Sequence, residues 1–243
     1  MTRDVVDVSE ANGVVSWPDV AKHVDAAIIR VGYRGYGAAG TLQADKQFRR
    51  NIAEALAAGL PVGVYWCTQA LSDAEAREEA AFVHSLIRDY KLTYPVYLDS
   101  EWMEPNARGR ADQISKSRRT QYALTWMQAM QTYGHLPGLY TGESWYTDLI
   151  DGPAIAKAGY AIWLAKYSGT SPRHPHAGWQ YTDSATVPGI PTRADLSHFY
   201  VDYATAEYRQ AVQRRFGLEE ATLDYLAAYK YGADLLRKLA TKG

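Results

Sequence analysis

The chain has 243 residues, a length that is common for one α/β barrel, so one main domain is expected. Its 26 Lys and Arg residues are balanced by 27 Asp and Glu residues. Without excess positive charge, neither a nucleic acid nor an anionic membrane surface is expected as a partner.

Short apolar runs alternate with longer amphipathic stretches along most of the chain. This alternation is typical of a parallel sheet built from repeated strand and helix units. Eight strands are predicted, at Asp4–Val8, Ala26–Val31, Pro61–Cys67, Pro95–Glu101, Pro137–Thr141, Tyr160–Ala165, Gly178–Tyr181 and Ala194–Phe199.

Three amphipathic helices are predicted between the first five strands, at Asp45–Ala58, Asp73–Tyr90 and Asp112–Tyr133. Their apolar residues recur at helical spacing, and Gly59 and Gly134 stand where a glycine commonly ends a helix. The last three strands are joined by segments rich in Gly, Pro, Ser and Thr that are too short for full helices. The barrel is therefore expected to be regular over its first five strands and irregular over its last three.

A helical pattern follows the last predicted strand. It covers Tyr203–Arg215 and Leu218–Leu239, with Gly217 between them and Gly232 as a further candidate break. An apolar stripe runs along the second stretch, formed by Leu223, Leu226, Leu235, Leu236 and Leu239. Such a stripe predicts burial but not its partner. Packing on the barrel and homo-oligomer formation through these helices both stay open.

Several common features are missing from the sequence. The N-terminal residues lack the apolar stretch of a signal peptide, and no later run is long enough to span a bilayer, so a protein made in the cytoplasm is expected. Cys67 is the only cysteine, and its apolar strand favours a small buried residue over a nucleophile. His174 and His176 lie in a loop without further ligands nearby, so no metal site is predicted.

One predicted strand, Pro95–Glu101, ends in two acids, Asp99 and Glu101. Because side chains alternate along a strand, both acids point to one face, roughly 6.6 Å apart along the strand. Active sites of α/β barrels lie at this end of the strands, and glycoside hydrolysis is the common reaction that needs a carboxylate pair. We interpret Glu101, with the longer side chain, as the general acid and Asp99 as the charge stabiliser. Trp102 is expected to wall the site and to help keep the acid protonated.

Two further acids lie on the first and the last predicted strands, Asp7 and Asp195. In a closed barrel those strands are neighbours, so both carboxylates are expected at the same mouth as the pair above. Taken singly, Asp7 is better explained as a cap and Asp195 as a turn residue. Only closure of the barrel predicts a cluster of four acids.

Seven short motifs stand in order between about Arg3 and Phe199. They are Asp7-Val8-Ser9, Gly63-Val64-Tyr65, Asp99-Ser100-Glu101, Gly138-Leu139-Tyr140-Thr141, Ile162-Trp163-Leu164-Ala165-Lys166-Tyr167, Trp179-Gln180-Tyr181 and Asp195-Leu196. Together they closely resemble glycoside hydrolase family 25, the lysozyme family found in bacteria and in phage endolysins. Glu10, Trp66, Cys67 and Gln69 depart from the family pattern, which bears on the fine structure of the substrate rather than on the reaction.

The resemblance implies an irregular TIM-type α/β barrel, (β/α)5(β)3, over residues 1–203, followed by a C-terminal helical extension over 204–243. It implies hydrolysis of the β-1,4 bond from N-acetylmuramic acid to N-acetylglucosamine in the peptidoglycan of the bacterial cell wall, without a cofactor. It places the acid role on Glu101 and supporting carboxylates on three residues: Asp7, Asp99 and Asp195. The substrate contacts that we predict are Tyr65, Trp102, Tyr140, Trp163 and Gln180.

Alternatives stay open at this point. The resemblance implies retention of configuration with help from the acetamido group of the substrate, whereas the carboxylate spacing by itself fits neither a direct nucleophile nor an inverting pair better. A chitinase-type barrel also ends a strand in Asp-x-Glu, but Pro95 and Tyr97 stand where it carries further aspartates. A non-catalytic wall-binding protein has no need for buried acids. For the helical extension, wall attachment is an alternative to self-association.

Overall fold

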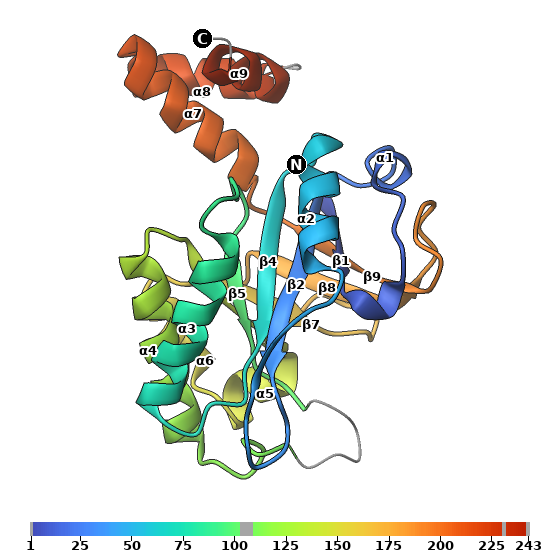
Figure 1. Cartoon of the computed structure of the whole chain (residues 1–243). Helices are drawn as coiled ribbons and strands as arrows, with labels where there is room; N and C mark the ends of the chain where they lie inside the picture. Colours follow the sequence, from blue (N-terminus) through green and yellow to red (C-terminus); the bar gives the residue numbers. More distant parts are fainter. Residues whose placement is uncertain (1, 103–108, 230–231, 242–243) are drawn as a thin grey trace. The chain divides into compact units, whose positions relative to one another are not determined.

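A computed structural model describes residues 2–102, 109–229 and 232–241 of the chain. The chain forms two compact units, 2–200 and 201–243. The first contains a β-sheet with helices between its strands, and the second is helical (Figure 1). The assignment of the activity to 1–203 and of a separate extension to 204–243 stays a prediction.

Eight strands of the described part of the chain close into a barrel. They are β1 (Arg3–Val8), β2 (Ala26–Arg34), β4 (Val62–Cys67), β5 (Val96–Asp99), β6 (Pro137–Gly142), β7 (Ala161–Ala165), β8 (Gly178–Ala185) and β9 (Ala194–Phe199). Neighbours from β1 through β2 to β8 pair in parallel, whereas β9 runs antiparallel to both β8 and β1. The pairing of β1 with β2 closes the ring. The predicted irregular α/β barrel is confirmed.

The three predicted helices connect the early strands, as α2 (Phe48–Ala57), α3 (Asp73–Ile87) and α4 (Lys116–Thr132). α3 and α4 pack side by side (Figure 1). α2 begins later than predicted because the Asp45 carboxylate accepts hydrogen bonds from the backbone amides of Glu10 and Gln47, both at 2.8 Å. α4 also begins later, after its cap residue Ser115. Gly59 and Gly134 follow α2 and α4 with positive φ angles of 82° and 84°, as expected for glycines that end helices.

Five short elements were not predicted: η1 (Glu10–Asn12), α1 (Trp17–Val20), β3 (Leu42–Ala44), α5 (Glu143–Asp148) and α6 (Gly152–Lys157). Each spans fewer than two periods of its own type, whereas a repeated period is the signal that sequence patterns supply. β3 pairs antiparallel with the end of β2 and has no buried residue. In the fully described segments 166–177 and 186–193, no helix joins the last three strands, so the late irregularity is confirmed.

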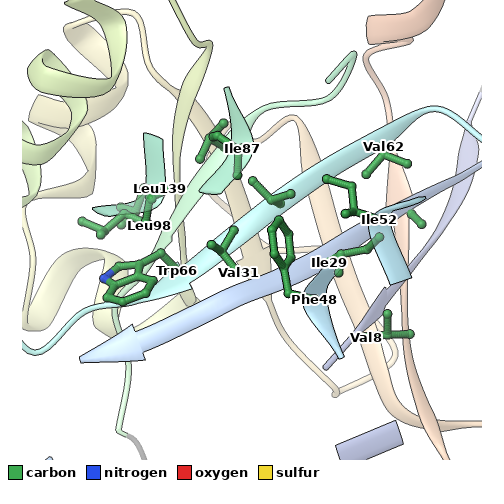
Figure 2. Packing of buried hydrophobic residues seen from close by; sticks show 14 of the residues in the cluster. Val8, Ile29, Val31, Phe48, Ile52, Val62, Trp66, Ile87, Leu98 and Leu139 are labelled. Carbon is green, nitrogen blue, oxygen red and sulfur yellow. The ribbon is translucent and has the colours of Figure 1, made fainter. Parts of the chain in front are cut away.

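The main core lies between the barrel strands and the surrounding helices. Alternate residues of β2, β4, β5 and β6 point outward into it, because side chains of a strand alternate between its two faces. Figure 2 shows these side chains packed against residues of α2 and α3. Labelled members of this layer are Val8, Ile29, Val31, Phe48, Ile52, Val62, Trp66, Ile87, Leu98 and Leu139.

Aromatic rings fill the barrel interior below its mouth. The ring centroids of Tyr97 and Trp163 lie 5.2 Å apart, and those of Trp163 and Phe199 lie 5.9 Å apart. Two glycines leave room for them: a Cβ at Gly138 would stand 2.5 Å from the Tyr97 ring, and one at Gly178 would stand 2.5 Å from the Phe199 ring. The rings form the floor beneath the polar residues of the mouth.

Replacing Gly138 with Ala should destabilise the fold by about 1–3 kcal/mol, because the added methyl group forces the Tyr97 ring to move in a close-packed interior. Gly142 on the same strand is the matched control, since a Cβ there meets nothing within 4 Å. Urea unfolding of both variants measures the effect. Equal unfolding midpoints for Gly138→Ala and Gly142→Ala would contradict the packing argument.

The second unit consists of α7 (Tyr203–Phe216), α8 (Glu220–Ala228) and α9 (Gly232–Thr241). Its small core is formed by Val212, Leu223 and Leu236. Gly217 ends α7 in the left-handed region with a φ of 63°, which glycine adopts without strain. The predicted stretch Leu218–Leu239 is divided into α8 and α9. Among the described residues, no helix is both long and apolar enough to cross a bilayer.

Candidate active site

The sheet register brings four acids to one end of the barrel. Asp7 pairs with Asp195 across β1 and β9, and Asp99 pairs with Cys67 across β5 and β4. With Glu101, these acids line a single cavity of about 140 Å³. The remaining residues that line it are Arg30, Tyr36, Tyr65, Cys67, Tyr140, Trp163 and Gln180.

A larger hollow, of about 790 Å³, lies along α4. Asp151 is the one carboxylate among its described lining residues, which are otherwise Ser, Thr, Gln, Leu and Lys. General acid and base chemistry on a glycosidic bond needs two carboxyl groups in reach of each other. The smaller cavity at the barrel mouth is therefore the candidate active site.

Asp99 ends β5 and is 3% exposed. Its Oδ2 accepts a hydrogen bond from Sγ of Cys67 at 3.0 Å. Its Oδ1 is buried and has no hydrogen-bond partner among the described residues. Burial raises the pKa of Asp99 to about 7, against the opposing effects of the Cys67 hydrogen bond and the Arg30 charge. Asp99 therefore changes its charge near neutral pH.

Glu101 lies two residues beyond β5, although the strand was predicted to include it. The ladder ends early because the Ser100 carbonyl accepts a hydrogen bond from the Thr141 hydroxyl at 2.7 Å. The Glu101 side chain nevertheless lines the same cavity as Asp99. Its pKa is raised well above the ordinary value, first by burial and then by the negative charges of Asp99 and Asp195. Burial and the neighbouring acids thus favour the protonated form of Glu101.

Asp7 and Asp195 face each other across the closure of the barrel. Burial raises the pKa of Asp7 well above its ordinary value, and the neighbouring charge of Asp195 raises it further. Burial also raises the pKa of Asp195. Gln180 donates from Nε2 to Oδ2 of Asp7 at 2.9 Å. Both shifts disfavour the state in which the two carboxyl groups are ionised together.

Gln180 is fixed by three hydrogen bonds. Besides donating to Asp7, it accepts at Oε1 from the hydroxyls of Tyr140, at 2.8 Å, and Tyr167, at 2.7 Å. Because both hydroxyls donate to the same oxygen, the orientation of the amide is determined. The hydrogen bonds of Gln180 therefore connect β1, β6 and β8 across the mouth of the barrel.

The aromatic residues predicted to contact substrate differ in whether they line the cavity, form its floor or lie outside it. Tyr65 and Tyr140 line the cavity, and the Tyr140 ring lies 4.4 Å from that of Trp163. Trp163 is 1% exposed and donates from Nε1 to Oγ of Ser197 at 3.0 Å, so it forms part of the floor. Trp102 is 46% exposed and packs edge-on against Trp145 at 5.1 Å, and it is not among the cavity-lining residues.

Arg30 and Cys67 were not predicted as site residues. Arg30 donates from Nε to Asp45 at 2.8 Å and lies 3.3 Å from Glu10, which places a paired cation in the wall of the cavity. An arginine inside an otherwise apolar strand was the signal that could have found it. Cys67 is buried as expected, but its thiol also donates a hydrogen bond to Asp99, an acid of the site. Among the described side chains, no three His, Cys, Asp or Glu residues are placed to hold a metal ion.

Solved structures with the same fold include an autolysin, a lysozyme and an endolysin. The chain is 30% identical to the modular autolysin LytC from Streptococcus pneumoniae, solved in complex with a synthetic peptidoglycan ligand, with a TM-score of 0.71 over 82% of this chain and 47% of that one. The chain thus spans about half the length of this relative. No curated protein sequence matches the chain.

Two less similar structures are covered almost completely. The bacterial lysozyme from Streptomyces coelicolor is 22% identical, with a TM-score of 0.67 over 82% of this chain and 92% of that one. The catalytic domain of the endolysin ply40, from bacteriophage P40 of Listeria monocytogenes, is 20% identical, with a TM-score of 0.66 over 84% and 95%. At these sequence identities the similarity shows a shared fold and nothing further. The model of glycosyl hydrolases family 25 matches residues 6–190, and the chain belongs to this family.

Proposed function

We propose that the chain is a lysozyme that hydrolyses the β-1,4 bond between N-acetylmuramic acid and N-acetylglucosamine in bacterial peptidoglycan. The observation that carries the proposal is one cavity in which Asp99 and Glu101 lie together with pKa values raised by burial. Family membership and the peptidoglycan ligand of the pneumococcal autolysin support the choice of substrate.

Glu101 is the general acid in this proposal. A carboxyl group that keeps its proton near neutral pH can donate it to the leaving glycosidic oxygen as the bond breaks. The charges of Asp99 and Asp195 favour the protonated form of Glu101. After the sugar departs, the resulting carboxylate accepts a proton from the water that completes the hydrolysis.

Asp99 is the charge stabiliser. In the substrate-assisted route, the acetamido oxygen of N-acetylmuramic acid attacks its own anomeric carbon, and the amide nitrogen gains positive charge. The unpartnered Oδ1 of Asp99 is suited to accept a hydrogen bond from that nitrogen. Two inversions at the anomeric carbon then leave its configuration retained.

The other predicted residues are proposed to bind the glycan strand. Asp7 and Asp195 accept hydrogen bonds from sugar hydroxyls, with Gln180 holding Asp7 in place. The predicted aromatic contacts are Tyr65, Trp102, Tyr140 and Trp163. In this proposal the catalytic part is 1–203, and 204–243 has self-association and wall attachment as its alternative roles.

The test is digestion of purified peptidoglycan by the full chain. We expect the turbidity of the suspension to fall and, after borohydride reduction, mass spectrometry to find fragments that end in reduced N-acetylmuramic acid. The rate should rise as pH passes through about 7, where Asp99 loses its proton, and fall again once Glu101 is ionised. Fragments that end in reduced N-acetylglucosamine, or no fragments at all, would overturn the proposal.

A further inference from the structure

The thiol of Cys67 lies beside the proposed charge stabiliser. Cys67 ends β4 in register with Asp99 at the end of β5, and both side chains line the same cavity. Sγ stands 3.0 Å from Oδ2 of Asp99, and the two residues are 6% and 3% exposed. The contact is therefore held by neighbouring strands and is closed to bulk water.

The two oxygens of Asp99 are in unlike surroundings. Oδ2 accepts the hydrogen bond from Cys67, whereas Oδ1 is buried without a partner in the described part of the chain. A buried carboxylate oxygen without a partner is costly unless a ligand completes it. Fixing Oδ2 also fixes the direction in which Oδ1 points.

We propose that Cys67 is a positioning residue for the hydrolysis: its thiol holds Oδ2 of Asp99, so that Oδ1 is presented to the acetamido N–H of the substrate. This inference rests on the proposed function of Asp99. The step needs no covalent chemistry at sulfur. The thiol donates a hydrogen bond and keeps its proton throughout the reaction.

The surroundings of Cys67 suit a donor rather than a nucleophile. Burial raises the pKa of the Cys67 thiol well above its ordinary value, and the charge of Asp99 raises it further, so the sulfur keeps its proton where Asp99 is ionised. A donor that points at the carboxylate favours its charged form. Other charged or titratable groups that face Asp99 in the cavity are Asp7, Arg30, Tyr36, Tyr65, Glu101, Tyr140 and Asp195.

Three variants separate positioning from packing. Cys67→Ala and Cys67→Val both remove the donor, and their side chains are smaller and larger than the thiol. Cys67→Ser keeps a donor at the same place. A role in packing alone makes the outcome follow side-chain size, whereas a positioning role makes it follow the presence of the donor.

We expect Cys67→Ala and Cys67→Val to lower kcat on peptidoglycan roughly tenfold with little change in KM, because the lost hydrogen bond is to a charged group but comes from a weak donor. Cys67→Ser should recover most of the lost kcat. The acidic limb of the pH profile should move to higher pH in the Ala and Val variants and return towards its original place in the Ser variant. Thermal melting of each variant reports any loss of folding.

The carboxyl resonance of Asp99, followed by NMR against pH in the full chain, tests the contact without any assay of activity. An Asp99 pKa that rises in Cys67→Ala and Cys67→Val but not in Cys67→Ser supports the inference. An unchanged titration, wild-type kcat in the Ala and Val variants, or equal losses in all three would overturn it. Failure of the wild-type chain to release muropeptides would instead overturn the proposed function.

Discussion

Replacing Glu101 with Gln should lower kcat on peptidoglycan by about 100-fold to 10,000-fold, the usual contribution of a general acid. Glutamine keeps the shape of the side chain but has no acidic proton for the leaving oxygen. Muropeptide release by the two proteins at equal concentration measures the loss. Glu54→Gln on α2 is the control, because Glu54 lies at the surface, paired with Arg50 at 2.8 Å.

The same variant should be more stable than the wild-type chain at neutral pH. The pKa of Glu101 in the folded state is raised above that of an unfolded chain, so its contribution to stability is full at low pH and is lost as pH rises through the folded pKa. Glutamine does not titrate. The melting temperature of Glu101→Gln should therefore exceed that of the wild-type chain by more at pH 8 than at pH 4.

The two readouts together exclude misfolding as the cause of lost activity. A variant that is inactive and melts lower than the wild-type chain at pH 8 would mean that Glu101 supports the fold. A variant that retains the wild-type kcat would remove Glu101 from the role of general acid. Only inactivity together with higher stability at pH 8 fits the proposal.

Replacing Arg34 with Met should destabilise the fold by about 3–5 kcal/mol, the usual effect of removing one partner of a buried ion pair. Arg34 is 3% exposed and donates from Nε to Oε1 of Glu79 at 2.8 Å; Glu79 is 0% exposed. Without Arg34, Glu79 is left as a buried charge that has lost its charged partner, although it still accepts a hydrogen bond from the Thr68 hydroxyl at 2.7 Å. Chemical unfolding at pH 7 measures the change.

The pH dependence of this loss has a definite sign. Burial raises the pKa of Glu79 above its ordinary value, and loss of the Arg34 charge raises it further. The cost of an unpaired carboxylate therefore grows as pH rises and is relieved once Glu79 takes up a proton. Arg34→Met should lose less stability at pH 4 than at pH 7.

Two further variants complete this test. Lys22→Met breaks a surface pair, with Lys22 and Asp19 67% and 51% exposed, and should cost far less stability than Arg34→Met because water screens the pair. Adding Glu79→Leu to Arg34→Met removes the stranded charge and should restore part of the lost stability. A double variant less stable than Arg34→Met alone would show that Glu79 contributes through its other hydrogen bonds.

Local patterns found the long elements because each carries several repeats of its own period. The strand Ala194–Phe199 was predicted to the residue, and α3 begins at Asp73 as expected. The strand β3 and the helix α5 each complete fewer than two repeats of their own period, so sequence alone could not separate them from loops.

The candidate site likewise has residues that the sequence predicts and contacts that it does not predict. Apolar runs that end in acids are visible in the sequence, and they pointed to Asp7, Asp99 and Glu101, whereas Asp195 was added because the first and last strands of a closed barrel are neighbours. The partners of those acids are not visible. Cys67 and Asp99 are 32 positions apart in the chain and share a hydrogen bond because β4 and β5 lie in one register.

The sequence by itself determined the barrel architecture, the strand ends that carry acids and the family of the chain. Each of these follows from short motifs and from hydrophobic periodicity, which are local properties of the chain. Tertiary structure decided the partners of those acids, the burial that raises their pKa values, and the hydrogen bond from the Cys67 thiol to Asp99. These properties depend on strand register and on burial. Both arise only when segments far apart in the chain exclude water from the same place.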